Sequence, residues 1–73
     1  MKHYIDSNNN SNVRSYDYGD NWIIIEFKDG SIYKYTYFSS GSYNIEEMKR
    51  LADRGDGLNS FISKSKPSYE IKY

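Results

Sequence analysis

The sequence predicts a single α+β domain: a small antiparallel β-meander of three to four strands, with one main helix and a short second helix packed on one face. Three observations predict this class. Segments between residues 13 and 37 have the two-residue period of strands, the period changes to 3.6 after residue 44, and 73 residues leave room for one domain. Ten acidic residues balance ten basic ones, and nine tyrosines favour a folded, Tyr-rich core over disorder.

Residues 1–10 are expected to form an N-terminal arm that precedes a single domain at 11–73. The Ser and Asn side chains between residues 7 and 12 compete for backbone hydrogen bonds and show no periodicity, which indicates a loop. A first strand is expected at 13–18, before a turn at 19–21. Its two faces would carry Val13, Ser15 and Asp17 on one side, and Arg14, Tyr16 and Tyr18 on the other.

The next segment predicts a hairpin, with strands at 22–27 and 31–37. A two-residue loop would set Ile25 opposite Lys34, whereas a three-residue loop with Gly30 in the left-handed bulge position sets Ile25 opposite Tyr33. Only the second register separates an apolar face from a mixed one. The expected core face is Ile23, Ile25, Phe27, Tyr33, Tyr35 and Tyr37.

The opposite face of this hairpin is more apolar than is usual for a sheet face exposed to solvent. It carries Trp22, Ile24 and Ile32 beside polar residues, and three large apolar side chains need a cover. The cover is either the arm, through Tyr4 and Ile5, or another chain. We expect a homo-oligomer with this face buried between copies.

Two helices and a short strand are expected after a Ser/Gly loop at 38–43. The first helix has a capping box at Asn44 and Glu47, and Gly55 follows its last turn. Its buried face is Ile45, Met48, Leu51 and Ala52. The second helix begins after Gly57, buries Leu58, Phe61 and Ile62, and ends near Pro67. Alternation at 69–73 allows an edge strand.

The sequence offers no catalytic or metal-binding set of residues. There is no Cys, and the one His, His3, lies in the arm, so thiolate and polyhistidine sites are excluded and no cofactor is expected. Glu46 and Glu47 are consecutive in a helix and point in different directions. The longest apolar run, residues 22–25, is far shorter than the about 20 residues that span a bilayer. We expect a non-enzymatic, soluble, cytoplasmic protein without a membrane segment.

The stretch around Gly55 and Gly57 is the candidate ligand site. Two glycines that lead into a helix N-terminus can present backbone N–H groups to a phosphate or carboxylate, and the helix dipole adds positive charge. Basic residues would add charge and a tyrosine would stack on a base. The predicted ligand-binding residues are Arg50, Arg54, Gly55, Gly57, Leu58, Asn59, Ser60 and Tyr43.

The same stretch also has a purely structural interpretation, in which the glycines end one helix and turn into the next while the arginines answer the helix dipole. Asp56 would repel an anion. Residues 49–73 hold six basic and three acidic side chains, too weak a bias for duplex DNA but compatible with a compact anion.

The order of the residues resembles a KTSC domain over about residues 11 to 70. The pattern is Ser11-Asn12-Val13, Tyr16-Asp17, Ile23-x-Ile25-x-Phe27-x-x-Gly30-x-x-Tyr33-x-Tyr35, then Ala52-x-x-Gly55-x-Gly57-Leu58-Asn59-x-Phe61-Ile62. The chain departs from the family at 38–41, where a Val-Pro step is usual. KTSC domains occur as appendages of lysyl-tRNA synthetases and as small free-standing bacterial and phage proteins, so the resemblance implies one of these origins.

Three functions follow as expectations. The first is a non-catalytic bacterial or phage protein that binds or sequesters a nucleotide or another small phosphorylated ligand, acting in the host cytoplasm if phage-encoded. The second is an anti-CRISPR-like or other anti-defence inhibitor that binds a host defence protein through Trp22, Ile24 and Ile32 or through acidic residues. The third is an RNA-binding accessory domain, as the synthetase appendages imply.

Overall fold

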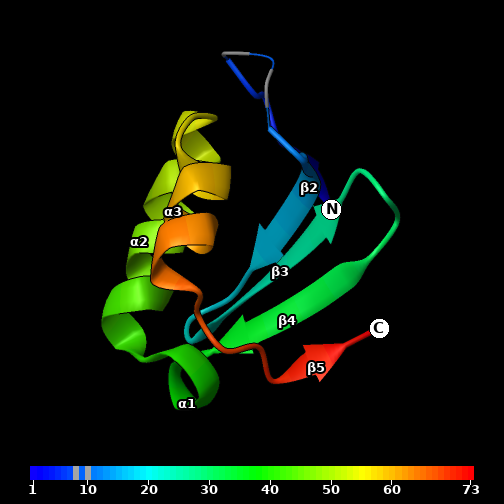
Figure 1. The fold of residues 1–73 in the computed structure, drawn as a ribbon. Helices are drawn as coiled ribbons and strands as arrows, with labels where there is room; N and C mark the ends of the chain where they lie inside the picture. The colour runs from blue at the N-terminus through cyan, green and yellow to red at the C-terminus, as the bar shows by residue number, and fades with distance from the viewer. Residues whose placement is uncertain (8, 10) are drawn as a thin grey trace.

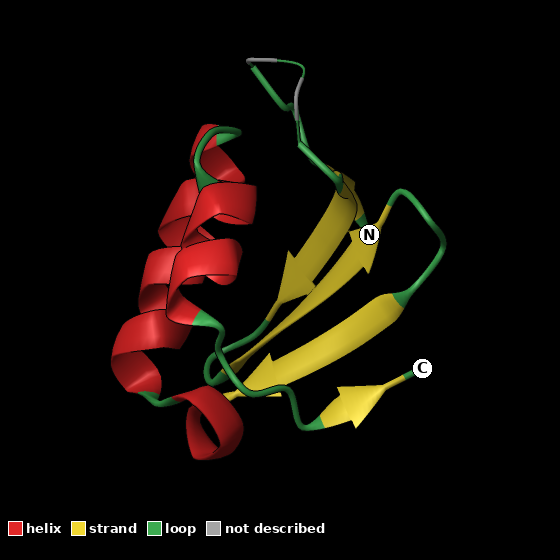
Figure 2. Ribbon diagram, viewed as in Figure 1, coloured by secondary structure: helices red, strands yellow, loops and turns green. Residues whose placement is uncertain are grey.

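The computed structural model describes residues 1–7, 9 and 11–73, and within them it forms an α+β fold (Figure 1). An antiparallel sheet of five strands runs in the order β1-β2-β3-β4-β5, so each described strand pairs with its neighbour in sequence. The strands are β1 (Lys2–His3), β2 (Val13–Tyr18), β3 (Trp22–Phe27), β4 (Ile32–Thr36) and β5 (Ile71–Lys72). The helices are α1 (Tyr37–Ser40), α2 (Ser42–Arg54) and α3 (Leu58–Ser65). Figure 2 shows α2 and α3 stacked on one side of the sheet, and the predicted fold class is confirmed.

The register of the β3–β4 hairpin is the predicted one. Ile23 lies opposite Tyr35 and Ile25 opposite Tyr33, while Gly30 takes a left-handed φ of 92° in the connecting loop. Because directly opposed residues share a face, this register places Ile23, Ile25 and Tyr35 in the core.

A β-bulge in β2 changes the predicted faces of that strand. Val13 pairs with Phe27 but Ser15 pairs with Glu26, so the register shifts at Arg14. As a result Val13 and Tyr16 are both buried on the helix side, although strict alternation had put them on opposite faces.

The segment predicted as an arm is built into the fold. β1 pairs with β2, the Tyr4 amide donates to the Arg14 carbonyl at 2.9 Å, and the Tyr4 side chain is buried. Further along, the amide and the hydroxyl of Ser7 both donate to the Gly55 carbonyl, at 2.8 and 2.7 Å. Of the predicted loop at 7–12, residues 8 and 10 lie outside the described part.

The region after β4 differs from the prediction. Thr36 caps the short helix α1 through a reciprocal bond with Ser39, so a helical turn replaces part of the expected loop at 38–43. Tyr37, expected in the core, is consequently exposed, and its hydroxyl donates to Glu46. The capping box predicted at Asn44 is wrong: α2 begins at Ser42, and the side-chain amide of Asn44 donates to the Ser40 carbonyl.

The core lies between the sheet and the two longer helices. The predicted buried face of α2 is confirmed, and α3 contributes Leu58, with Phe61 and Ile62 packed at the margin. The buried core residues are Tyr4, Val13, Tyr16, Ile23, Ile25, Tyr35, Ile45, Met48, Leu51, Ala52 and Leu58.

Candidate functional site

Gly55 and Gly57 shape the turn between α2 and α3. Gly55 ends α2 with φ 75°, and its carbonyl is occupied by the two bonds from Ser7. A Cβ on Gly55 would lie 2.9 Å from the Ile5 Cβ, so the glycine allows the N-terminal segment to approach the backbone. Gly57 precedes α3 with φ 86°. Both glycines therefore have structural reasons to be present.

The hollow at the N-terminus of α3 is small and acidic. It encloses about 130 Å³, and the side chains of Asp6 and Asp56 line it together with Asn59 and Ser60. Two carboxylates oppose the favourable helix dipole for a phosphate. Leu58, also predicted for the site, is fully buried in the core, and its N–H faces the Tyr4 hydroxyl at 3.4 Å.

Of the other predicted site residues, Arg54 lies at this turn, whereas Arg50 and Tyr43 do not. Arg50 pairs with Glu47 on the exposed side of α2, and the Arg54 guanidinium donates to the Asp56 carbonyl at 3.4 Å. Tyr43 is 74% exposed in the first turn of α2. Twelve residues of helix rise separate Tyr43 from Gly55, about 18 Å. The predicted base-stacking and phosphate-binding groups thus lie at opposite ends of one helix.

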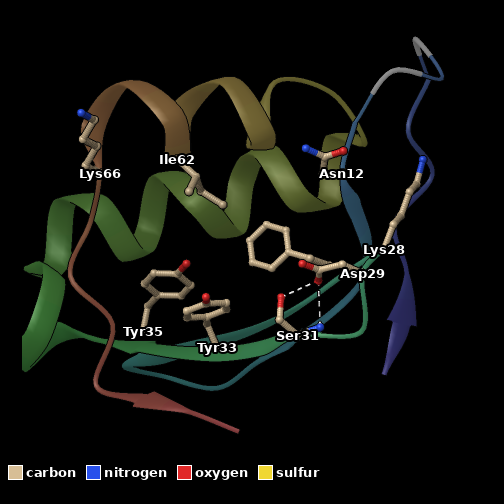
Figure 3. A pocket seen from close by; sticks show the side chains of 9 residues that line it. Asn12, Lys28, Asp29, Ser31, Tyr33, Tyr35, Ile62 and Lys66 are labelled. Carbon is tan, nitrogen blue, oxygen red and sulfur yellow. Dashed lines mark hydrogen bonds between the residues drawn. The ribbon is translucent and has the colours of Figure 1, made fainter.

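A groove of about 610 Å³ lies elsewhere, between the hairpin end of the sheet and α3 (Figure 3). Phe27, Tyr33 and Tyr35 form its sheet side. Ile62 of α3 and Lys66, which directly follows α3, form the opposite side, and the remaining lining residues are Asn12, Lys28, Asp29 and Ser31. Its volume is in the range of small-molecule sites, about 300–1,000 Å³.

Aromatic contacts fix the tyrosines of the groove. The rings of Tyr33 and Tyr35 stack at 6.3 Å with an interplanar angle of 24°. Phe27 meets Tyr33 edge to face at 5.6 Å, and Tyr69 does the same from the segment before β5 at 4.9 Å. Rings held on both sides present an ordered aromatic surface at low conformational cost.

The hydroxyl of Tyr35 is a polar group on this aromatic surface. Tyr35 is only 4% exposed, yet its hydroxyl makes no hydrogen bond with any described residue. Figure 3 shows the hydroxyls of Tyr35 and Tyr33 on the side of the rings that faces α3. Burial raises the pKa of Tyr35 to about 12, with smaller contributions from Tyr33 and Tyr69. At neutral pH this group is an unused donor and acceptor.

Basic residues predominate at the rim. Lys66 directly follows α3 and has no ion pair with the described residues, while Lys28 lies 3.3 Å from Asp6. The Lys72 ammonium lies 5.4 Å from the centre of the Tyr33 ring. Asp29, the acidic residue among the described lining residues, accepts the Ser31 hydroxyl and amide at 2.6 and 2.9 Å, and these bonds lower its pKa. An anion at the rim would meet more positive than negative charge.

A second cluster of titratable groups ties α2 to the sheet. Tyr16 and Tyr18 donate to the two oxygens of Asp53, at 2.7 and 2.6 Å, and Lys2 lies 3.6 Å from the same carboxylate. The bonds from Tyr18 and Tyr16 lower the pKa of Asp53, while burial and then the bond to Asp53 raise the pKa of Tyr16. All of the groups are mutually satisfied, so the cluster acts as a structural connection between layers.

Residues 1–7, 9 and 11–73 contain no group of three His, Asp or Glu side chains suited to a metal ion. In the same described residues, no helix combines the length and the apolar character needed to cross a bilayer.

No family model, curated protein or solved structure matches this chain. The resemblance to KTSC domains stays a prediction.

Proposed function

We propose that this protein is a non-catalytic binder of a nucleotide, and that the groove between β4 and α3 is its site. The observation that supports this most directly is the Tyr35 hydroxyl, which has no hydrogen-bond partner among the described residues, belongs to a residue that lines the groove, and is not fully buried. A polar group that lines a largely apolar cavity and has no partner in the protein is available to orient a ligand, so a ligand in the groove would find a donor and acceptor there.

The base of the nucleotide would occupy the aromatic side of the groove. The Tyr35 hydroxyl can donate to a ring nitrogen or accept from an exocyclic amine, and the side-chain amide of Asn12 can do both at the far end. Phe27, Tyr33 and Ile62 offer the apolar contact that a planar ring requires. Asp29 at the rim can accept hydrogen bonds from sugar hydroxyls.

The phosphate would lie near Lys66, where no described carboxylate competes for the ammonium. Lys66 also offsets the negative end of the α3 dipole, which would otherwise repel an anion. Lys28 can contribute when it turns from Asp6. This site uses none of the residues first expected from the glycine turn, but it keeps the predicted class of ligand.

Calorimetric titration with adenosine, AMP, GMP, CMP and ATP tests the proposal. We expect at least one nucleotide to bind, Tyr35→Phe to weaken its binding about fivefold or more, and Lys66→Ala to weaken the nucleotide but not its nucleoside. Matched controls are Tyr43→Phe on α2 and Lys64→Ala, two residues from Lys66 and outside the groove lining. The proposal is refuted if no compound binds at millimolar concentration, or if the controls weaken binding as much as the groove variants.

A further inference from the structure

The sheet face that turns away from the helices, which we call the open face, is built from cross-strand rows. In one row Asp17 pairs with Ile24, Ile24 with Lys34, and Lys34 with Ile71. In the next row Ser15, Glu26 and Ile32 lie side by side. Directly opposed residues project to the same side of a sheet. Both α2 and α3 lie on the other side (Figure 2).

The described part of the N-terminal segment does not cover the open face. Tyr4 is buried on the helix side, and Ile5 lies against Gly55 at the α2–α3 turn. The sequence allows two covers for Trp22, Ile24 and Ile32. The internal cover, through Tyr4 and Ile5, is wrong, and the alternative is another chain.

The open face combines apolar area with polar edges. Its apolar residues Trp22, Ile24 and Ile32 are half-buried. The Trp22 indole lies against Gly19, and the Lys34 ammonium lies 5.5 Å from the centre of the Trp22 ring. At the β5 edge Ile71 is 39% exposed and Tyr73 is 64% exposed. The Tyr73 amide donates to the Ile32 carbonyl, which continues the register and puts Tyr73 on this face.

We propose that the open face binds a second copy of this chain around a twofold axis that runs along β3. In the row Asp17, Ile24, Lys34, an acidic and a basic residue lie on either side of an isoleucine. A twofold rotation about Ile24 therefore matches each charge with the opposite charge of the second copy. The axis brings Asp17 of each copy opposite Lys34 of the other, and places Ile24 against Ile24 at the centre. Neither Asp17 nor Lys34 has an ion pair among the described residues, so both charges are available to a second copy.

The axis also brings Glu26 near Glu26 of the second copy. Contacts within each copy reduce the repulsion between these two carboxylates. The Glu26 carboxylate accepts the Ser15 hydroxyl at 2.7 Å and lies 3.7 Å from the Arg14 guanidinium. Each Glu26 thus arrives with a bonded partner and a neutralising cation.

The size of the face indicates a weak dimer. Four strand spacings of about 4.8 Å, by about five residues of 3.3 Å each, give roughly 320 Å² of flat area per copy. Projecting side chains make the buried surface larger than this flat area, but two copies together still bury about 1,000 Å² or less. This total is at the lower limit for specific interfaces. We therefore expect a dissociation constant on the order of 10–100 μM.

Sedimentation equilibrium between about 1 μM and 1 mM tests the proposal. The unmodified chain should pass from monomer to dimer, and Asp17→Lys or Lys34→Asp should each raise the dissociation constant about tenfold or more, because each substitution opposes like charges twice. The double variant carrying both substitutions should restore dimerisation. Lys64→Asp, an exposed lysine of α3, is the matched control and should have no effect.

A second measurement needs no variant. Amide chemical shifts of the unmodified chain should change with concentration in β3, β4 and β5 and stay constant in α2 and α3. A monomer at 1 mM, shift changes confined to the helices, or folded single variants whose combination fails to restore the dimer would each overturn the proposal.

Discussion

Replacing Tyr35 with Phe is expected to stabilise the ligand-free protein, which is unusual for a change at a core position. The substitution keeps the stacked ring and removes only an oxygen that has no described hydrogen-bond partner. A buried hydroxyl without a partner costs about 1–3 kcal/mol. Ordinary loss of packing does not offset this, because Phe retains the ring contacts with Tyr33 and the core.

The magnitude is expected to lie below that range, because the hydroxyl is not fully buried. No fully buried side-chain polar atom of the described residues lacks a partner, so the Tyr35 oxygen keeps some contact with the groove and its solvent. We expect Tyr35→Phe to raise the free energy of unfolding by about 0.5–1 kcal/mol. For a domain of this size, 1 kcal/mol corresponds to about 4–8 °C in the melting temperature.

Tyr16→Phe is the matched comparison, because Tyr16 is also a buried tyrosine of the sheet. Its hydroxyl donates to Asp53 at 2.7 Å, and its loss should cost about 1–2 kcal/mol, since hydrogen bonds to charged groups are the stronger ones. The two Tyr-to-Phe changes should thus act in opposite directions.

Urea denaturation and thermal melts followed by circular dichroism measure both effects. A loss of more than about 0.5 kcal/mol in Tyr35→Phe would show that the hydroxyl is bonded in the free protein, and the argument for a ligand at that atom would fail. Ultraviolet titration gives an independent check. The Tyr35 pKa of about 12 lies above the unfolded value of about 10, so stability from this group is complete below pH 10 and is lost as pH rises toward 12.

The remaining predictions concern the N-terminal segment and the Asp53 cluster. Gly55→Ala should lower stability by about 2 kcal/mol and Gly57→Ala by about 1 kcal/mol, because both have positive φ but only the Cβ on Gly55 would meet Ile5, whereas the Cβ on Gly57 would meet the flexible Arg54 side chain. Tyr4→Ala should cost about 3 kcal/mol or more if the segment is part of the core, and a cost below 1 kcal/mol would contradict that. Hydrogen bonds from Tyr18 and Tyr16 lower the pKa of Asp53, so its contribution is present above the ordinary carboxyl range and is lost as pH falls through it; acid titration of Asp53→Asn should show a shallower loss than the unmodified chain.

The hairpin and α2 were predictable because local rules determine them. Gly30 selects the loop, and the loop fixes which residues oppose each other, so Ile25 and Tyr33 follow without any knowledge of the rest. The apolar spacing of α2 likewise reports its own buried face, from Ile45 to Ala52.

Three features were not predictable, since each depends on contacts distant in sequence. The bulge at Arg14 has no turn residue to mark it, and its effect is that Val13 and Tyr16 share a face. Burial of Tyr4 requires α3 to be in place, because Leu58 lies against its hydroxyl. The groove exists because α3 leaves one end of the sheet uncovered, and no sequence pattern states how far a helix extends over a sheet.

One signal for the groove was nevertheless present in the sequence. Tyr33 and Tyr35 were expected on the core face as replacements for Leu and Val, and Tyr35 is indeed buried. A tyrosine on a core face brings a hydroxyl that must find a partner, whereas Phe27 brings none. Tyr35 lines the groove between β4 and α3, so the need of its hydroxyl for a partner indicates this groove.

The alternation of β4 places the two proposed sites on opposite surfaces of one strand. Tyr33 and Tyr35 line the groove, whereas Lys34 between them lies on the open face. A dimer formed through the open face therefore leaves both grooves accessible, one on each outer side of the pair. Charge reversal at Lys34 should change the oligomeric state and leave nucleotide affinity unchanged, whereas Tyr35→Phe should do the reverse. If nucleotide affinity instead falls with Lys34→Asp in a folded chain, the strand does not separate the two sites, and one of the two placements is wrong.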